Sequence, residues 1–193
     1  MRLSDLPSTP TFELDAPQAL YRVQQKRSRK GTLRVGRVLL APPGLLAWRF
    51  DLSDTPVGYF ALAPVTALYE AVCRRETTGV SLQLLAARSL VHLRVSQRLQ
   101  LVDLRAMSCA WPVLQSMRFS HTQTLAADAF ALGFAGIIYR SAQQADMDCI
   151  ALFGEAISTL KWIRTEPLVE SGTGGLHAVA ATAIRGSQVL VLP

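Results

Sequence analysis

The segment WRFDLSDTPVGYFALAPVTALYE, residues 48–70, decides how the rest of the chain can be arranged. It opens with an arginine between two aromatic residues, and serine, aspartate, proline and glycine at 53–58 then favour a turn. Residues 58–62 predict a short buried strand. Pro64 suits the first turn of a helix, because its missing N–H costs nothing there, and apolar residues follow it at helical spacing. The segment therefore predicts an extended stretch, a turn, a strand and a helix in close succession.

Three side chains of this segment can meet in space. Arg49, Tyr59 and Glu70 lie on successive elements that a single tight turn brings together. An arginine, an aromatic ring and a carboxylate on one scaffold suggest a pocket for a phosphate-bearing, aromatic ligand. The alternative is structural: the arginine extends over apolar surface to solvent, Tyr59 belongs to the core, and Glu70 pairs with Arg74 four residues later.

Composition predicts one folded domain with a basic surface. The 193 residues are long enough for a well-buried core, and a hydrophobic content of 50% with 18% charged residues argues against disorder. The net charge is +6, and six basic residues within twelve positions are not interrupted by an acid: Lys26, Arg27, Arg29, Lys30, Arg34 and Arg37. This basic loop fits a solvated surface, a phosphate-binding rim, or a patch for an acidic partner or nucleic acid. We rank nucleic acid last, because no zinc-finger spacing, recognition-helix pattern or aromatic RNA-binding signature is present.

The cysteines and the apolar runs indicate a cytoplasmic protein. Cys73, Cys109 and Cys149 are widely spaced, which favours free thiols in a reducing compartment. No apolar run reaches the roughly 18–20 residues of a membrane span, and the first ten residues contain two prolines where a signal core would lie. No cluster of histidine, cysteine or aspartate has ligand spacing, so we expect no metal site.

The remaining periodicity predicts short strands and a few helices. Strands are expected at 19–23, 90–95, 99–104, 136–141, 149–153 and 188–192, and helices at 121–132 and 155–164. A turn at Gln97 and Arg98 would join the strands 90–95 and 99–104, and His92 would be exposed on the polar face of the first. Arg74 and Arg75 would close the helix that begins at Pro64. This order predicts an α+β fold, a single domain with a mixed or antiparallel sheet and flanking helices.

Two further polar residues extend the candidate site. Arg22 lies in the first predicted strand, and Ser141 ends the predicted strand 136–141, a place where functional groups are frequent. The surroundings of Ser141, YRSA, lack the glycine-flanked elbow of a serine hydrolase. We therefore group Ser141 and Arg22 with Arg49, Tyr59 and Glu70.

The order of several motifs resembles the RES domain, a family named for an arginine, a glutamate and a serine. The motifs are LYRV at 20–23, WRF at 48–50, GYFA at 58–61, TALYE at 66–70, GIIYRS at 136–141 and IALF at 150–153. The resemblance runs from about residue 19 to 155, and each motif alone is loose. It implies a RES-like catalytic domain at 19–165, preceded by an irregular lead-in at 1–18 and followed by an extension at 166–193 that packs on the same domain.

The resemblance also implies a function. RES proteins are toxins of bacterial toxin–antitoxin pairs, usually with an Xre-type helix-turn-helix antitoxin, and their fold is similar to that of ADP-ribosyltransferase toxins. Members degrade NAD by hydrolysis or phosphorolysis, or transfer ADP-ribose to a protein. NAD would thus be a substrate, and no cofactor is expected. The resemblance does not identify the acceptor of the ADP-ribose group, which could be water, phosphate or a protein. An alternative function is a non-catalytic module that binds a nucleotide or nucleic acid.

The residue types suit this chemistry. Breaking the bond between nicotinamide and ribose develops positive charge on the ribose, which the Glu70 carboxylate would stabilise. Arg49 and Ser141 would be its catalytic partners, Ser141 by binding the ribose or by holding Glu70. Arg22 and Arg49 would bind the diphosphate, because guanidinium groups bind phosphate in a bidentate manner. Tyr59 would stack on or orient nicotinamide, and Tyr21 would also contact NAD.

Two positions depart from the family pattern. Asp51 follows the second arginine motif where many members have asparagine or serine, and Asp148-Cys149 stands where the last strand often opens with asparagine. A phosphate acceptor would need a further cationic subsite, which Lys26 or Arg27 could provide.

Overall fold

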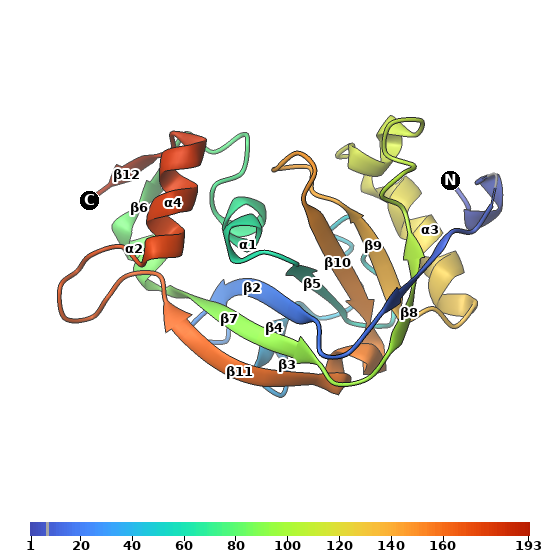
Figure 1. The fold of residues 1–193 in the computed structure, drawn as a ribbon, viewed down its shortest axis with the longest axis horizontal. Coiled ribbons are helices and arrows are strands. Elements are labelled where there is room, and N and C mark those ends of the chain that lie inside the picture. Colours follow the sequence, from blue (N-terminus) through green and yellow to red (C-terminus); the bar gives the residue numbers. More distant parts are fainter. Residues whose placement is uncertain (7) are drawn as a thin grey trace.

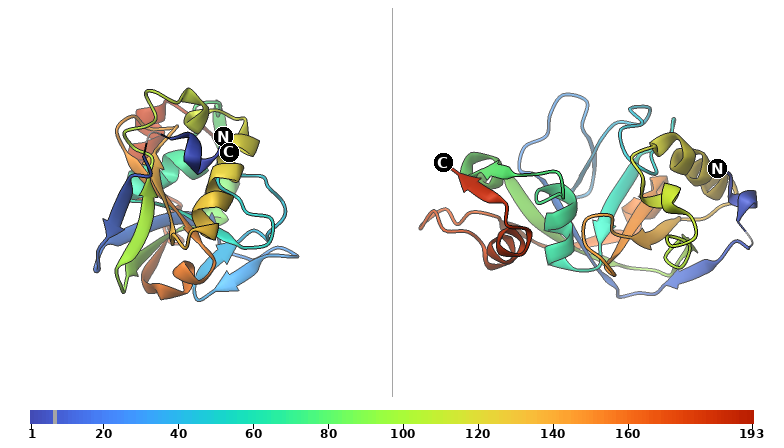
Figure 2. Two further views of the ribbon diagram at one scale, coloured as in Figure 1. Left: turned by 90° about the vertical axis from the view of Figure 1, so that its right-hand side faces the viewer. Right: turned by 90° about the horizontal axis from the view of Figure 1, so that it is seen from above.

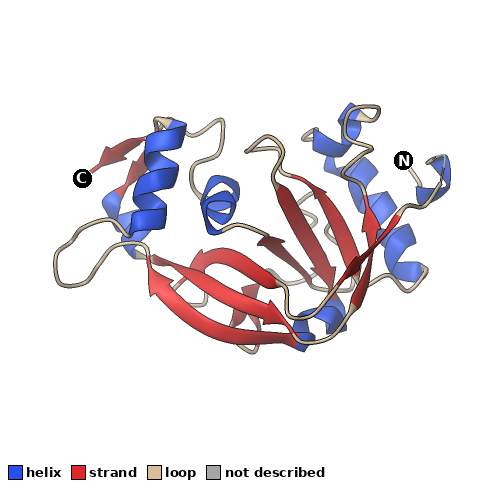
Figure 3. Cartoon of the chain, viewed as in Figure 1, coloured by secondary structure: helices blue, strands red, loops and turns tan. Residues whose placement is uncertain are grey.

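A computed structural model of the protein describes residues 1–6 and 8–193, and its centre is a curled sheet of eight strands (Figures 1 and 3). Every neighbouring pair is antiparallel except β8 and β9, which are parallel. In spatial order the strands are β1 (Thr11–Leu14), β8 (Leu99–Asp103), β9 (Gly136–Arg140), β10 (Asp148–Phe153), β5 (Val57–Ala61), β2 (Ala19–Gln25), β7 (Arg88–Val95) and β11 (Leu160–Pro167).

Helices and two small sheets surround this central sheet. The α-helices are α1 (Pro64–Ala71), α2 (Leu82–Ala86), α3 (Phe119–Ala131) and α4 (Ala178–Ser187). The 3-10 helices are η1 (Leu3–Asp5), η2 (Pro112–Gln115) and η3 (Gly154–Thr159). The small sheets pair β3 (Leu33–Val35) with β4 (Val38–Leu40) and β6 (Gly79–Ser81) with β12 (Leu190–Leu192). Figure 2 shows α4 and β12 at one end of the molecule and α3 with the N-terminal residues at the other.

The sheet is buried on both faces, which explains the continuous apolar runs of its central strands. Successive side chains of a strand point to opposite faces, and in β10 Cys149 and Ala151 join a core that also contains residues of α1, α3 and α4. Ile150 and Leu152 join a second core on the other face, together with Ile157 of η3. The predicted α+β class, with its mixed sheet and flanking helices, is confirmed.

Some local predictions were wrong. The strands predicted at 90–95 and 99–104 form but do not pair: β7 lies between β2 and β11, and β8 lies between β1 and β9. Because β7 is flanked on both sides, nearly all of it is buried, and the predicted alternation does not hold. The segment 155–164 is helical only to Thr159, and Trp162 lies in β11.

The helices also differ from prediction. Helix α1 ends at Ala71, because the N–H groups of Val72 and Cys73 both bind the carbonyl of Leu68, so Arg74 and Arg75 lie beyond it. Helix α4 was not predicted; it packs against α1, and its small residues Ala180 and Ala183 are fully buried. In the described part of the chain, no helix has the length and hydropathy needed to cross a membrane.

Candidate functional site

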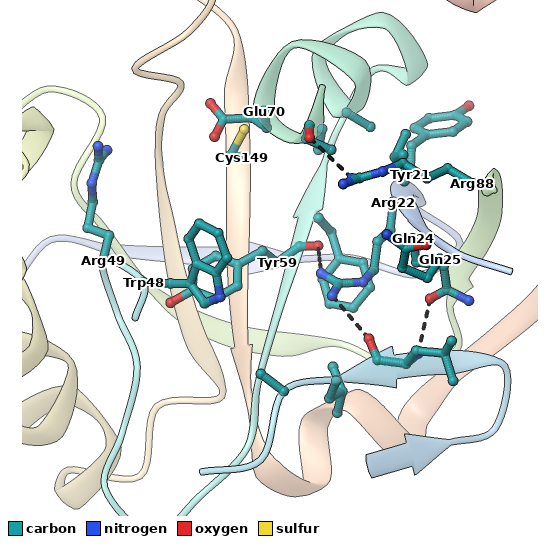
Figure 4. Close-up of a pocket in the computed structure, with 18 of the residues that line it drawn as sticks. Tyr21, Arg22, Gln24, Gln25, Trp48, Arg49, Tyr59, Glu70, Arg88 and Cys149 are labelled. Carbon is teal, nitrogen blue, oxygen red and sulfur yellow. Dashed lines mark hydrogen bonds between the residues drawn. The ribbon is translucent and has the colours of Figure 1, made fainter. Parts of the chain in front are cut away.

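A cavity of about 460 Å³ opens where two central strands diverge. Strands β2 and β5 pair at one position, Tyr21 opposite Ala61, and beyond it their side chains face a shared space below helix α1 (Figure 4). The cavity wall includes five of the six predicted site residues: Tyr21, Arg22, Arg49, Tyr59 and Glu70. The fold thus brings together side chains from Tyr21 to Glu70, which are 49 positions apart in the sequence.

Glu70 presents its carboxylate to the cavity from the last turn of α1 (Figure 4). Its Oε1 accepts a hydrogen bond of 2.5 Å from the hydroxyl of Ser141, which lies directly after β9. Arg74, the alternative partner of Glu70, instead pairs with Glu76 at 2.7 Å. The carboxylate is therefore held by a neutral donor and has no cationic partner within 4.0 Å among the described residues.

Ser141 is the sixth predicted residue, and it lies behind the cavity wall. Its side chain is 3% exposed, and its Oγ also accepts hydrogen bonds from the backbone N–H groups of Gln143 and Gln144, each at 3.0 Å. Three hydrogen bonds fix the hydroxyl in one orientation. The structure therefore shows the contact with Glu70, the second of the two roles considered for Ser141, and its part in the reaction stays a prediction.

Arg22 spans the gap between the diverging strands. Its guanidinium donates to the carbonyl oxygens of Tyr59 at 2.8 Å and Leu39 at 3.1 Å, which fixes the side chain across β5 and β4. Its Nε is buried without a hydrogen-bond partner among the described residues. Burial lowers the pKa of Arg22 to about 10, because the charged form has lost much of its hydration. An anionic ligand would balance the positive charge of Arg22 in this environment.

Arg49 enters the cavity from the side opposite Arg22 (Figure 4). Its Nη2 donates to the carbonyl of Gln115 at 3.3 Å, and its guanidinium carbon lies 6.0 Å from the centre of the Tyr139 ring. Its backbone carbonyl accepts a hydrogen bond from Thr122 of α3, at 2.5 Å. Thr122 is fully buried and thus joins α3 to the segment that carries Arg49.

Tyr59 contributes its ring to the cavity, while its hydroxyl is used elsewhere. The hydroxyl accepts from the N–H of Phe50 and donates to Asp51 Oδ1, both at 2.9 Å. Asp51 Oδ2 also accepts from the N–H of Trp48, at 2.9 Å. The aspartate that departs from the family pattern thus fastens the 48–51 segment to β5 and does not line this cavity.

Tyr21 lies on the cavity wall and also contacts a polar pair on the neighbouring strands β7 and β11. Its ring meets that of His92 edge-on, with the centroids 5.1 Å apart, and His92 Nε2 lies 2.5 Å from Glu166 of β11. His92 is 8% exposed, so its predicted exposure was wrong. Strand β11 covers it, a pairing that local alternation does not indicate.

The cavity is strongly cationic. Among the described residues that line it, Glu70 is the one carboxylate, whereas six arginines contribute: Arg22, Arg27, Arg29, Arg49, Arg74 and Arg88. The basic loop supplies two of them, which favours its interpretation as a phosphate-binding rim. Arg88 was missed by sequence reasoning, because it has no motif around it and reaches the cavity only through the pairing of β7 with β2.

The wall beside Glu70 is largely uncharged. Cys149 and Tyr139 are buried there, and burial raises the pKa of the thiol and of the phenol well above their usual values. Cys73, Cys109 and Cys149 are all free, as predicted from their spacing. Among the described residues, no group of three or more histidine, cysteine or acidic side chains could hold a metal ion.

Comparison with known proteins identifies similar sequences and folds. The model of the RES domain family matches residues 19–169. The fold is similar to that of a chain in the crystal structure of the M. tuberculosis MbcT–MbcA toxin–antitoxin complex, with a TM-score of 0.57. The two chains are 14% identical over 79% of this chain and 85% of the other, so the likeness concerns the fold. No curated protein sequence matches the chain.

Proposed function

The chain belongs to the RES domain family, and on this basis we propose that it is the toxin of a toxin–antitoxin pair and acts by consuming NAD. One observation carries the proposal: the sole carboxylate on the described cavity wall, Glu70, is fixed by a buried hydroxyl and faced by arginines. A dinucleotide combines the features that such a cavity suits, namely a diphosphate, aromatic rings and a ribose that becomes cationic during reaction.

The arginines would bind the diphosphate and orient the substrate. Arg22 is held rigidly by two carbonyl groups and has no carboxylate partner within 4.0 Å among the described residues, so an anion would supply its missing counter-charge. Arg49 approaches from the other side and would fix the second end of the ligand. Preorganised charges of this kind lower the cost of binding, because little side-chain entropy is lost.

Glu70 would act on the ribose. When the bond between C1 of the ribose and the nicotinamide nitrogen breaks, the bonding electron pair leaves with nicotinamide and positive charge spreads over C1 and the ring oxygen. A carboxylate at this position stabilises that charge, and the surrounding low-polarity wall strengthens the effect. An acceptor oxygen then bonds to C1; with water as acceptor the products are ADP-ribose, nicotinamide and a proton.

An antitoxin is the expected partner. The similar fold comes from a toxin–antitoxin complex, and the cavity of this chain is bordered by the exposed basic loop. We expect an acidic segment of an Xre-type antitoxin to lie over the arginines, since charge complementarity would guide its binding. The bound segment would then exclude NAD from the cavity.

The test is NAD consumption by the purified protein with the products resolved. We expect loss of NAD and release of nicotinamide, both strongly reduced in Glu70→Gln and retained in Glu155→Gln, which removes an exposed carboxylate elsewhere. NAD that stays intact when it is incubated with the purified native protein would contradict the proposal. If NAD were then consumed only when a protein acceptor is added, the activity would be ADP-ribosyl transfer.

A further inference from the structure

Arg88 is a second arginine of the cavity that lacks a counter-charge. Its Nη1 donates to the carbonyl of Ala71 at 3.2 Å, at the end of α1, and its Nε is buried without a partner among the described residues. No carboxylate in the described chain lies within 4.0 Å of its guanidinium. A carbonyl carries only a partial negative charge, so most of the Arg88 charge and several of its donors stay available.

The basic loop contributes a second guanidinium, that of Arg29, to the cavity wall that Arg88 also lines. The N–H of Lys26 binds the carbonyl of Ala87 at 2.8 Å, which fixes the start of the loop next to Arg88. Arg29 and Thr32 then close a turn, because the Arg29 N–H donates to Thr32 Oγ1 at 3.0 Å and the Thr32 N–H donates to the Arg29 carbonyl at 3.0 Å. Burial lowers the pKa of Arg88, and the positive charge of Arg29 lowers it further. Arg29 and Arg88 thus both contribute positive charge to the cavity wall.

This pair is separate from Arg22 along the sheet. In the pairing of β2 with β7, Arg22 lies opposite Val91 and Arg88 lies opposite Gln25. The two positions are three residues apart along the strands, or about 10 Å at the usual rise of a strand. Arg22 is also fixed to carbonyl groups of β5 and of β4, whereas Arg88 is fixed to the end of α1.

We propose that Arg88 and Arg29 form a second phosphate subsite, distinct from the diphosphate position at Arg22. Two guanidinium groups with free donors and no acidic neighbour match a phosphate dianion, which accepts several charge-assisted hydrogen bonds. The group could arrive as free inorganic phosphate or as a phosphate ester on the ligand, as in the 2′-phosphate of NADP. The inference deepens the proposed function, because it adds a ligand group to the same cavity.

A binding experiment tests the subsite without turnover. The melting temperature of the protein is measured against inorganic phosphate, with chloride at matched ionic strength as the reference. We expect phosphate to raise the melting temperature of the native protein, of Arg22→Gln and of the control Arg185→Gln, which removes an exposed cation of α4. The increase should be clearly reduced in Arg88→Gln and in Arg29→Gln, in which phosphate can still bind at Arg22. Arg29→Gln changes an exposed loop residue, so folding is retained.

A second arm distinguishes the source of the phosphate. The affinity for NADP is compared with that for NAD in the native protein, in Arg88→Gln and in Arg185→Gln. If the ester is the ligand group, Arg88→Gln weakens NADP binding about tenfold or more and leaves NAD binding within about twofold. If free phosphate is the ligand, the melting-temperature effect appears and the two dinucleotides respond alike.

The proposal is overturned if phosphate stabilises Arg88→Gln as much as the native protein. It is also overturned if neither phosphate nor NADP shows any dependence on Arg88. Failure of the proposed function gives a different result: phosphate would still bind through Arg88 and Arg29 while NAD stayed intact.

Discussion

Ser141 acts through Glu70. Its buried hydroxyl donates to the carboxylate at 2.5 Å and accepts from two backbone N–H groups, so it fixes both the carboxylate and the loop that follows β9. A misplaced catalytic group is expensive, since a shift of about 1 Å can reduce a rate about 100-fold. We therefore expect the serine to affect the reaction through Glu70 and not through contact with the substrate.

We expect Ser141→Ala to lower kcat about tenfold to 100-fold while KM for NAD changes by less than about threefold. The free energy of unfolding should fall by about 1–3 kcal/mol, because two part-buried N–H groups lose their acceptor. Steady-state kinetics and chemical denaturation measure both effects, and Ser158→Ala, which alters an exposed hydroxyl, is the control. A change in stability with no change in kcat would contradict the positioning role.

Arg22 should make anion binding sensitive to high pH. Burial lowers its pKa to about 10 in the free protein, and a bound diphosphate favours the charged form and raises the pKa again. The affinity for the anion is therefore highest below the pKa of Arg22 in the free protein, and it declines as the pH rises through about 10. We expect the dissociation constant of ADP-ribose to increase over this range in the native protein. In Arg22→Gln, ADP-ribose should bind more weakly at every pH, and its affinity should not decline near pH 10. An identical pH profile in both proteins would refute the assignment of this decline to Arg22.

At the scale of the elements, the pairing of β9 with β10 positions the site. Gly136 lies opposite Leu152, and a Cβ atom at this glycine would come within 2.1 Å of the carbonyl oxygen of Ala151. A backbone atom cannot move aside as the end of a flexible side chain can. The close approach of β10 to β9 therefore requires glycine at residue 136, and Ser141 lies at the far end of the same strand.

We expect Gly136→Ala to destabilise the protein by about 2–3 kcal/mol, because the two strands must separate locally. For a chain of this length that corresponds to a fall in melting temperature of about 5–10 °C. Gly172→Ala is the matched control, since a Cβ there would meet no atom within 4 Å. Equal melting temperatures for the two variants would show that the strands are not packed as described.

The strands themselves could be predicted from sequence, whereas the order in which they pair in the sheet could not. β2, β5, β9 and β10 each carry a local signal, either an apolar run or an alternation, and all were predicted close to their observed bounds. The separation of β7 from β8 has no local signal, because the turn at Gln97 and Arg98 is equally compatible with a hairpin. Helix α4 was missed because its small residues, buried at the contact with α1, carry little hydrophobic periodicity.

At the scale of the whole molecule, charge should assist ligand capture. The chain carries a net charge of +6, and arginines outnumber carboxylates on the described cavity wall. Exposed charges such as those of the basic loop are screened by salt, since the Debye length falls from about 10 Å at 0.1 M to about 3 Å at 1 M.

We therefore expect KM for NAD to rise several-fold between about 0.05 and 0.5 M sodium chloride, with kcat nearly constant. The variant with Arg27 and Arg29 replaced by glutamine should show a smaller dependence on salt. The matched control replaces Arg98, which is exposed and paired with Glu13 and Asp15 away from the cavity, and it should behave as the native protein does. A KM that is insensitive to salt would contradict electrostatic assistance.

The residues of the candidate site that lie in sequence motifs were predicted. Arg22, Arg49, Tyr59, Glu70 and Ser141 were grouped from their order and from the family resemblance, and the contact between Ser141 and Glu70 was one of two roles considered. Arg88 was not predicted, because its place on the cavity wall depends on the register of β7 against β2, which follows from the packing of the whole sheet.

The central claim is that Glu70 stabilises the reacting ribose and contributes little to ground-state binding. The most direct test compares Glu70→Gln with the native protein in two quantities, kcat for NAD cleavage and the dissociation constant of ADP-ribose. We expect kcat to fall by about 10²–10³-fold or more while the dissociation constant stays within about threefold. A variant that binds ADP-ribose normally and still cleaves NAD at the native rate would contradict the account.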